Sequence, residues 1–170
     1  DTFEKLSESI ERAFQHDANV LVEEYIQGRE ATCGVIDDFR GERHYALPPI
    51  EIIPPSRGRN LPPHGEGPSR DNCFFDYDAK YSGKTREMCP SNFSAEEKKE
   101  IMRAAVLAHQ AVGARHYSRS DFIISPRGIF ILEINTLPGL TEESLLPKAC
   151  TAVGCTFSHM LDHVISLALK

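Results

Sequence analysis

Apolar residues recur at helical spacing in four parts of the chain. The first lies between residues 2 and 14, where polar neighbours separate the apolar positions of one helical face, namely Phe3, Leu6, Ile10 and Phe14. Ser94, with Glu97 three residues later, is the signature of a capping box, and Gly113 ends the helix that it opens. The pattern predicts helices over residues 2–14, 94–112, 147–153 and 157–168.

Short apolar runs and alternating segments predict β-strands between these helices. The predicted strands cover residues 20–22, 31–37, 43–47, 51–52, 121–125 and 129–135. Strands near both ends of the chain with helices between them indicate an α+β fold, an antiparallel sheet backed by helices. Residues 54–72 interrupt the pattern with five prolines, three glycines and almost nothing apolar. Such a stretch buries too little surface to offset its ordering entropy, so we expect a long mobile or functional loop.

The segment from Asp121 to Asn135 predicts a hairpin that gathers acidic groups. Residues 126–128 fit a three-residue loop, in which case Ser125 pairs with Ile129 and Asp121 lies opposite Glu133. Alternation then places five apolar residues on the core face, namely Phe122, Ile124, Phe130, Leu132 and Ile134. A two-residue loop would shift the register by one and scatter the acidic groups.

The opposite face of this hairpin carries candidate metal ligands. Asp121, Glu133 and Asn135 converge at one end of it, and Arg119 shares their face. Carboxylate and amide oxygens are hard ligands that suit Mg²⁺ or Mn²⁺, usually together with water and substrate phosphates. A solvated sheet face with an incidental pair of carboxylates explains the spacing equally well, so both interpretations stay open on spacing alone.

Charge and hydropathy exclude two classes of partner. The 170 residues carry 19 Lys plus Arg against 25 Asp plus Glu, which gives a net charge of −6. Without a cluster of basic residues, such a chain is a poor binder of nucleic-acid backbones. No run approaches the roughly 18 apolar residues that a membrane span needs, and the first residues do not resemble a signal peptide. We therefore expect neither a nucleic-acid nor a membrane partner.

The cysteines point to a reducing compartment. The chain has five, an odd number, scattered and never in a Cys-x-x-Cys arrangement. This usage favours reduced thiols packed in a cytoplasmic protein over a disulfide framework or a zinc site.

Three strings of residues resemble one known family. They are V-L-V-E-E-Y-I-Q-G-R-E at 20–30, F-D-Y-D-A-K-Y at 75–81 and E-I-N-T-L-P-G-L-T at 133–141, followed by Ser144-Leu145 and Pro147-Lys148. In this order they resemble the D-alanine–D-alanine ligases of the ATP-grasp superfamily, and the resemblance covers nearly the whole chain. It implies an ATP-grasp antiparallel sheet backed by helices over residues 1–170, the C-terminal catalytic part of a larger enzyme.

The resemblance also implies a reaction. ATP phosphorylates the carboxylate of one D-alanine, and the amine of a second D-alanine displaces phosphate from the acyl phosphate to form D-Ala-D-Ala for peptidoglycan. Asp121, Glu133 and Asn135 would hold two Mg²⁺ or Mn²⁺ ions that neutralise the transferring phosphoryl group. This raises the metal interpretation above the solvated sheet face.

Four further residues correspond to the family's nucleotide contacts. Glu23 and the backbone at Ile26 match positions that read adenine, and Glu30 matches the ribose contact. Lys80 would reach an ATP phosphate. Without the resemblance, Glu23 and Glu30 are interpreted as exposed charges at strand ends, and Lys80 as a solvated loop lysine.

Five residues correspond to contacts with the amino acid substrates. Arg119 and the Gly139 N–H would stabilise the tetrahedral intermediate, and Tyr81 would sit over the second D-alanine. Ser144 and the Leu145 backbone would hold the terminal carboxylate, because N–H groups at a helix start attract anions. Without the resemblance, Ser144 is interpreted as an ordinary helix N-cap residue.

The family's full chain is about twice as long, and its N-terminal half carries a Gly-rich phosphate loop that is absent here. We therefore expect a fragment that is inactive alone, and a homodimer is possible because the family commonly dimerises. Two alternatives remain. One is another ATP-grasp carboxylate–amine ligase, such as one that makes D-Ala-D-Lac or D-Ala-D-Ser. The other is a noncatalytic nucleotide-binding module.

Overall fold

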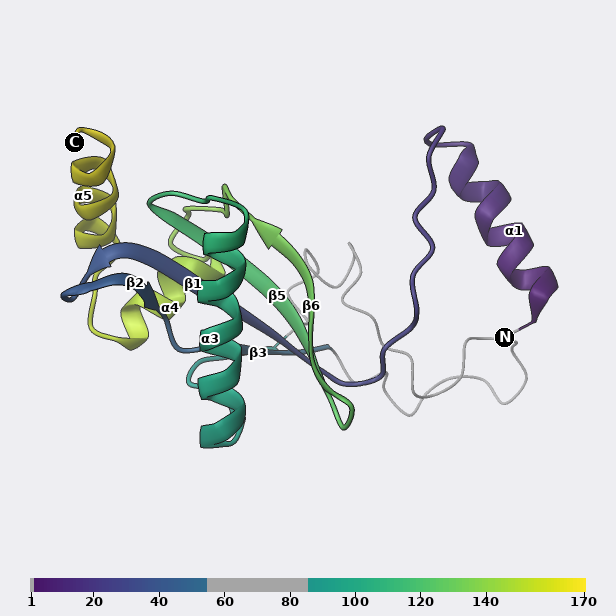
Figure 1. Cartoon of the computed structure of the whole chain (residues 1–170), viewed down its shortest axis with the longest axis horizontal. Helices are drawn as coiled ribbons and strands as arrows, with labels where there is room; N and C mark the ends of the chain where they lie inside the picture. Colours follow the sequence, from purple (N-terminus) through teal and green to yellow (C-terminus); the bar gives the residue numbers. More distant parts are fainter. Residues whose placement is uncertain (1, 55–85) are drawn as a thin grey trace.

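Six strands and four helices make up the parts of the chain that the computed structural model describes, residues 2–54 and 86–170 (Figure 1). The helices are α1 (Phe3–Phe14), α3 (Ala95–Ala111), α4 (Leu145–Ala152) and α5 (Phe157–Ala168). The strands are β1 (Arg29–Phe39), β2 (Glu42–Ala46), β3 (Ile50–Ile53), β4 (Arg86–Met88), β5 (Tyr117–Ser125) and β6 (Gly128–Asn135). Most of the loop predicted over residues 54–72 falls outside the described residues.

All six described strands join one antiparallel sheet, in which five follow the order β4-β3-β1-β5-β6 and the sixth, β2, pairs with β1. The central strand β1 pairs with β5 along one edge from Arg29 to Ile36. Along its other edge it pairs first with β3 and then with β2. This confirms the predicted α+β class with an antiparallel sheet. No described helix is both long and apolar enough to cross a membrane.

Helices cover the two faces of the sheet unequally. On one face α3 packs on a core that includes Val35, Ile101 and Phe122. On the other, α4 and α5 pack against Ile36, Leu47 and further residues at one end only (Figure 1). The rest of that second face is left for the polar residues described below.

The predicted helices are confirmed with small changes at their ends. Thr2 caps α1 by accepting a hydrogen bond from the Lys5 N–H. Both halves of the predicted capping box are present at the start of α3, between Ser94 and Glu97. Gly113 follows this helix with φ +63°, a left-handed backbone that glycine adopts without strain. The predicted start of α4 is two residues later than the observed one, and the predicted ends of α5 match the observed ends.

The predicted strand at residues 20–22 is wrong. The structure has no strand between α1 and Arg29, and the chain there leads from α1 to the sheet in an extended course (Figure 1). Leu21 is 81% exposed and Val22 58% exposed. An apolar run becomes a strand only where a neighbouring strand accepts its hydrogen bonds, and no described strand lies beside this one.

The predicted pairing of Asp121 with Glu133 is confirmed, but the loop and the strand that produce it differ from the prediction. Ser125 pairs with Gly128, so the loop has two residues instead of three. Phe122 pairs with Ile131, yet Asp121 pairs with Glu133, because a β-bulge at residue 132 inserts one extra residue. The bulge compensates for the shorter loop and restores the facing carboxylates.

The predicted core face of β6 is correspondingly wrong below the bulge. Ile129 and Ile131 share the face of Phe122 toward α3, whereas Phe130 pairs with Ile123 on the opposite face. Leu132, the bulge residue, is 50% exposed.

Candidate active site

Three neighbouring strands present polar side chains on the sheet face that α4 and α5 leave open. The register places Thr32 of β1 opposite Asp121 of β5, which in turn lies opposite Glu133 of β6. Along the same face, Arg119 lies opposite Asn135. Glu30 is two residues before Thr32 and therefore points the same way. The structure thus brings together five of the residues predicted from the sequence, namely Glu30, Arg119, Asp121, Glu133 and Asn135.

Asp121 is held by two neighbours. Thr32 Oγ1 donates to Asp121 Oδ1 at 2.6 Å. The Arg119 guanidinium donates to both carboxylate oxygens, from Nε and from Nη2, each at 3.0 Å. The side chains of Arg119 and Asp121 are 15% and 24% exposed. This bidentate ion pair between Arg119 and Asp121 fixes the direction of the carboxylate and offsets its negative charge.

Glu133 and Asn135 complete a set of oxygen donors. Glu133 is exposed directly opposite Asp121, where the like charges disfavour each other unless a cation lies between them. The Asn135 Oδ1 accepts a hydrogen bond from the Leu137 N–H at 3.0 Å, which orients its amide oxygen. Two carboxylates and one amide oxygen fit the preferences of Mg²⁺ or Mn²⁺ and lack the nitrogen or sulfur that zinc favours.

The loop after β6 turns back on itself at the start of α4. Thr141 N–H donates to Ser144 Oγ at 3.1 Å, and the hydroxyls of the two residues lie 2.8 Å apart. A Cβ at Gly139 would lie 2.9 Å from Ser144 Oγ, so glycine allows the close approach. Ser144 is the N-cap residue of α4, but its side chain makes no capping hydrogen bond. The N–H groups of the first helical turn, including that of Leu145, therefore point out of the start of the helix without a capping hydrogen bond from this side chain.

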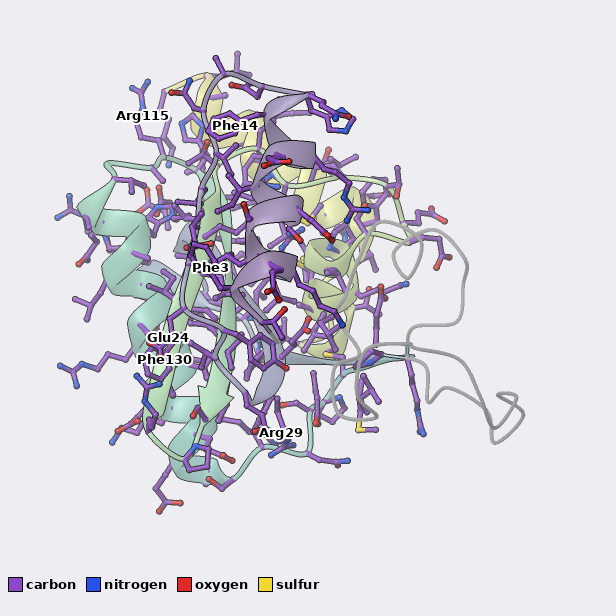
Figure 2. The ribbon with its side chains drawn as sticks, turned by 90° about the vertical axis from the view of Figure 1, so that its right-hand side faces the viewer. Phe3, Phe14, Glu24, Arg29, Arg115 and Phe130 are labelled. Carbon is purple, nitrogen blue, oxygen red and sulfur yellow. The ribbon has the colours of Figure 1, made fainter. Side chains whose placement is uncertain are left out.

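The extended segment before β1 carries Glu23 and Ile26. Glu23 is exposed and Ile26 is half-buried. The neighbouring Glu24 forms an ion pair with Arg127 in the β5–β6 turn, and the Arg127 guanidinium also lies 5.1 Å from the Phe130 ring. Figure 2 shows Glu24 and Phe130 close together at this edge. The segment is therefore attached to the tip of the hairpin that carries Asp121 and Glu133.

Lys80 and Tyr81 lie outside the described residues, so their predicted roles stay predictions. Sequence reasoning missed Thr32, whose hydroxyl contacts Asp121. Alternation within β1 places it on the face of Glu30, but only the register between β1 and β5 shows that it lies opposite Asp121.

Comparison with known proteins identifies the family of the chain. The model of the family described as "D-ala D-ala ligase C-terminus" matches residues 1–166. A D-alanine–D-alanine ligase of Syntrophobacter fumaroxidans is 42% identical over 169 residues, covering 98% of this chain and 49% of that protein. The chain thus spans about half the length of the curated relatives it matches.

Two crystal structures give the same result at the level of the fold. The D-alanine–D-alanine ligase of Bacillus anthracis complexed with ATP has a TM-score of 0.73 and 32% identity, covering 99% of this chain and 48% of that one. The VanG D-Ala:D-Ser ligase of Enterococcus faecalis has a TM-score of 0.75 and 34% identity, covering 98% of this chain and 43% of that one. From the family match and these likenesses, the chain belongs to the family of D-alanine–D-alanine ligase C-terminal domains.

Proposed function

We propose that residues 1–170 form the ATP-grasp domain of an ATP-dependent ligase that joins two D-alanines into D-Ala-D-Ala for peptidoglycan synthesis. The activity belongs to a protein of the relatives' full length, and residues 1–170 alone are inactive. The observation that carries the proposal is the direct pairing of Asp121 with Glu133, next to Arg119, in a chain of this family.

The metal is proposed from the donor set. Asp121, Glu133 and Asn135 would hold two Mg²⁺ or Mn²⁺ ions, which supply positive charge at the phosphates of ATP. Thr32 and Arg119 hold Asp121 in its observed direction, so the donor set is organised before nucleotide binds. ATP as the nucleotide is supported by the ATP-bound relative from Bacillus anthracis.

The nucleotide contacts are proposed from the position of the extended segment and β1. Glu23 and the Ile26 backbone would read adenine, and Glu30 would accept hydrogen bonds from the ribose hydroxyls. The Glu24–Arg127 ion pair ties this segment to the hairpin. Lys80 would contact a phosphate.

The proposed chemistry transfers the terminal phosphoryl group of ATP to the carboxylate of one D-alanine. The amine of the second D-alanine then attacks the acyl carbon, the C–O bond to phosphate breaks, and the amine loses a proton as the amide forms. Arg119 and the Gly139 N–H would stabilise the oxyanion of the tetrahedral intermediate. The Arg119 guanidinium carries five N–H donors, and one of those that do not contact Asp121 would donate to that oxyanion.

The second amino acid is proposed to bind at the start of α4. Ser144 and the Leu145 N–H would hold its carboxylate, because the unpaired N–H groups at a helix start favour an anion. Tyr81 would lie over its side chain. The close approach of Gly139 to Ser144 supports this proposal, because the oxyanion donor and the carboxylate contact would then be neighbours.

The test is turnover by the full-length protein with ATP, Mg²⁺ and D-alanine as the sole amino acid. ADP release matched by D-Ala-D-Ala, followed by mass, supports the proposal. ADP release that requires D-serine or D-lactate as acceptor would replace the substrate but keep the chemistry. Nucleotide binding without turnover on any acceptor would point to a noncatalytic nucleotide-binding module.

A D-Ala–D-Ser ligase is the second candidate because the VanG relative matches this chain with a TM-score of 0.75. Competition between D-alanine and D-serine in the same assay separates the two. We further propose a cytoplasmic location, supported by the four free cysteines among the described residues. A homodimer is also proposed, from the family resemblance alone.

A further inference from the structure

A second group of metal-type side chains lies away from the proposed active site. Asp37 of β1 and His44 of β2 pair directly across the hairpin, and His109 lies in the last turn of α3. Asp37 lies five positions after Thr32 in β1, which is roughly 17 Å along a strand. The odd number of steps also places the two residues on opposite faces of the sheet. The group is therefore distinct from the site with Asp121.

The three side chains converge on one small space. His44 Nδ1 lies 2.8 Å from Asp37 Oδ1, and His109 Nε2 lies 3.1 Å from the same oxygen. One ligand atom from each residue lies within 4.8 Å of the others. Around a tetrahedral ion bound at about 2.0–2.1 Å, neighbouring ligand atoms are about 3.3 Å apart. The two distances from Asp37 Oδ1 to the imidazole nitrogens therefore need to lengthen by only a few tenths of an ångström to accommodate an ion.

The buried imidazole of His109 is the strongest indication of a ligand. The side chain is 0% exposed, and its Nε2 makes no well-directed hydrogen bond although it faces Asp37. The other ring nitrogen, Nδ1, lies 2.7 Å from Ser118 Oγ. When that hydroxyl accepts the Nδ1 proton, the lone pair of Nε2 points into the group. A hydrogen-bonded far nitrogen of this kind is the usual arrangement of histidines that bind metals.

Asp37 is held in place and remains reachable from solvent. Its Oδ2 accepts a hydrogen bond from the His116 N–H at 2.7 Å, which leaves Oδ1 directed at the two imidazoles. The side chains of Asp37 and His44 are 18% and 19% exposed, so an ion has a path from the surface. The three residues belong to β1, β2 and α3, and a shared ion would join the hairpin to the helix.

We propose that Asp37, His44 and His109 form a binding site for a Zn²⁺-type divalent ion, with water in the fourth position. Two imidazole nitrogens and one carboxylate oxygen suit zinc and its neighbours, whereas the all-oxygen set of Asp121 and Glu133 suits magnesium. The ion has a structural role, because its ligands lie on the face opposite the proposed chemistry. This proposal does not depend on the proposed function.

The test uses the full-length protein, stripped with a chelator and kept in excess Mg²⁺ so that the oxygen site is filled. We expect one equivalent of Zn²⁺ to bind, and saturation at a hundredfold excess over the dissociation constant to raise Tm by about 5 °C. Bound Co²⁺ is expected to show the visible absorption of a four-coordinate nitrogen and oxygen site. His44→Gln and Asp37→Asn should lose the Zn²⁺ binding, the rise in Tm and the Co²⁺ spectrum. His159→Gln, on the exposed face of α5, should keep all three.

His44→Gln is the decisive variant because His44 is partly exposed and its replacement is compatible with folding, which circular dichroism checks. Equal Zn²⁺ binding by this variant and the parent protein would overturn the proposal. So would a Co²⁺ spectrum with the strong sulfur bands of thiolate ligands, or no Zn²⁺ bound at micromolar concentration.

Discussion

At the scale of single residues, the proposed metal site depends on how Asp121 is held. Its carboxylate accepts hydrogen bonds from Thr32 and from Arg119, so these two side chains orient a carboxylate that is a proposed metal ligand. A neighbour that orients a ligand commonly changes metal affinity or activity about 10- to 100-fold when it is removed. Thr32 is therefore proposed as a positioning residue, and its effect on metal affinity can be measured with a variant that leaves every proposed metal ligand unchanged.

Thr32→Val removes the hydroxyl while keeping the shape of the side chain. We expect turnover of the full-length protein to need about tenfold more Mg²⁺, because Asp121 loses one of its partners. The measurement is the Mg²⁺ dependence of ADP release. Thr32→Ser retains the hydroxyl and should behave like the parent protein. Equal Mg²⁺ dependence in all three proteins would show that Thr32 does not position Asp121 for the metal.

The buried cysteines are predicted to be chemically inert. Burial raises the pKa of Cys33 to about 12 and that of Cys150 to about 12. Near pH 8, only about one such thiol in 10,000 is ionised, and the thiolate is the reactive form. Iodoacetamide should leave both unmodified in the folded protein and label both after unfolding, as read by mass spectrometry. Labelling of Cys33 in the folded protein at the rate of an unfolded peptide would contradict this.

At the scale of elements, the packing of α4 on β1 depends on a missing side chain. A Cβ at Gly34 would lie 2.3 Å from Leu146 Cδ1 and 3.0 Å from Leu47 Cδ1, and both leucines are fully buried. Gly34→Ala should therefore lower the free energy of unfolding by about 1–3 kcal/mol through overpacking. Denaturant titration of the full-length protein measures the loss.

Leu146→Ala provides the matched background for this prediction. Removing the leucine side chain removes the clash, so the cost of Gly34→Ala should be smaller in the double variant than in the parent protein. Strictly additive free energies in the two variants would show that the two residues do not meet.

The hairpin of β5 and β6 shows what a sequence reveals about an element and what it hides. The facing carboxylates were predictable, because alternation and turn residues restrict the register to a few choices. The loop length was not, and the predicted core positions Phe130 and Leu132 were wrong because the bulge at residue 132 reverses the alternation. A bulge depends on contacts with the neighbouring strand, and no local pattern in β6 announces it.

The same limit applies to pairing between distant segments. The capping box at Ser94 was predictable because both of its partners lie within one turn. The contact of Thr32 with Asp121 joins residues 89 positions apart and needed the three-dimensional register. The apolar run at residues 20–22 has strand composition but no described partner, so composition alone gave the wrong prediction there.

At the scale of the whole molecule, α1 stands apart from the sheet. Among the described residues, Figure 1 shows α1 joined to β1 by the extended segment, and Figure 2 shows Phe3 and Phe14 along α1. Phe3 is 83% exposed and Phe14 is 55% exposed, and no residue of this helix is buried. An amphipathic helix with its apolar face in water favours association.

The replacement of both aromatic residues by serine tests this arrangement in residues 1–170 alone. Phe3→Ser with Phe14→Ser should reduce concentration-dependent association and leave Tm within about 1 °C, because neither ring packs in the core. Sedimentation velocity and thermal melts measure the two effects. A fall in Tm of several degrees would show that α1 packs on the sheet in solution.

Asp121 and Glu133 are proposed to hold the metal of an ATP-dependent ligase. The decisive measurement is ADP release by full-length Glu133→Gln, with ATP, Mg²⁺ and D-alanine at saturation. Gln keeps the volume of the side chain but not its charge, so we expect at least about a hundredfold loss of turnover. Glu96→Gln, on the exposed first turn of α3, should be unaffected. Full turnover by Glu133→Gln would contradict the assignment of this face as the catalytic metal site.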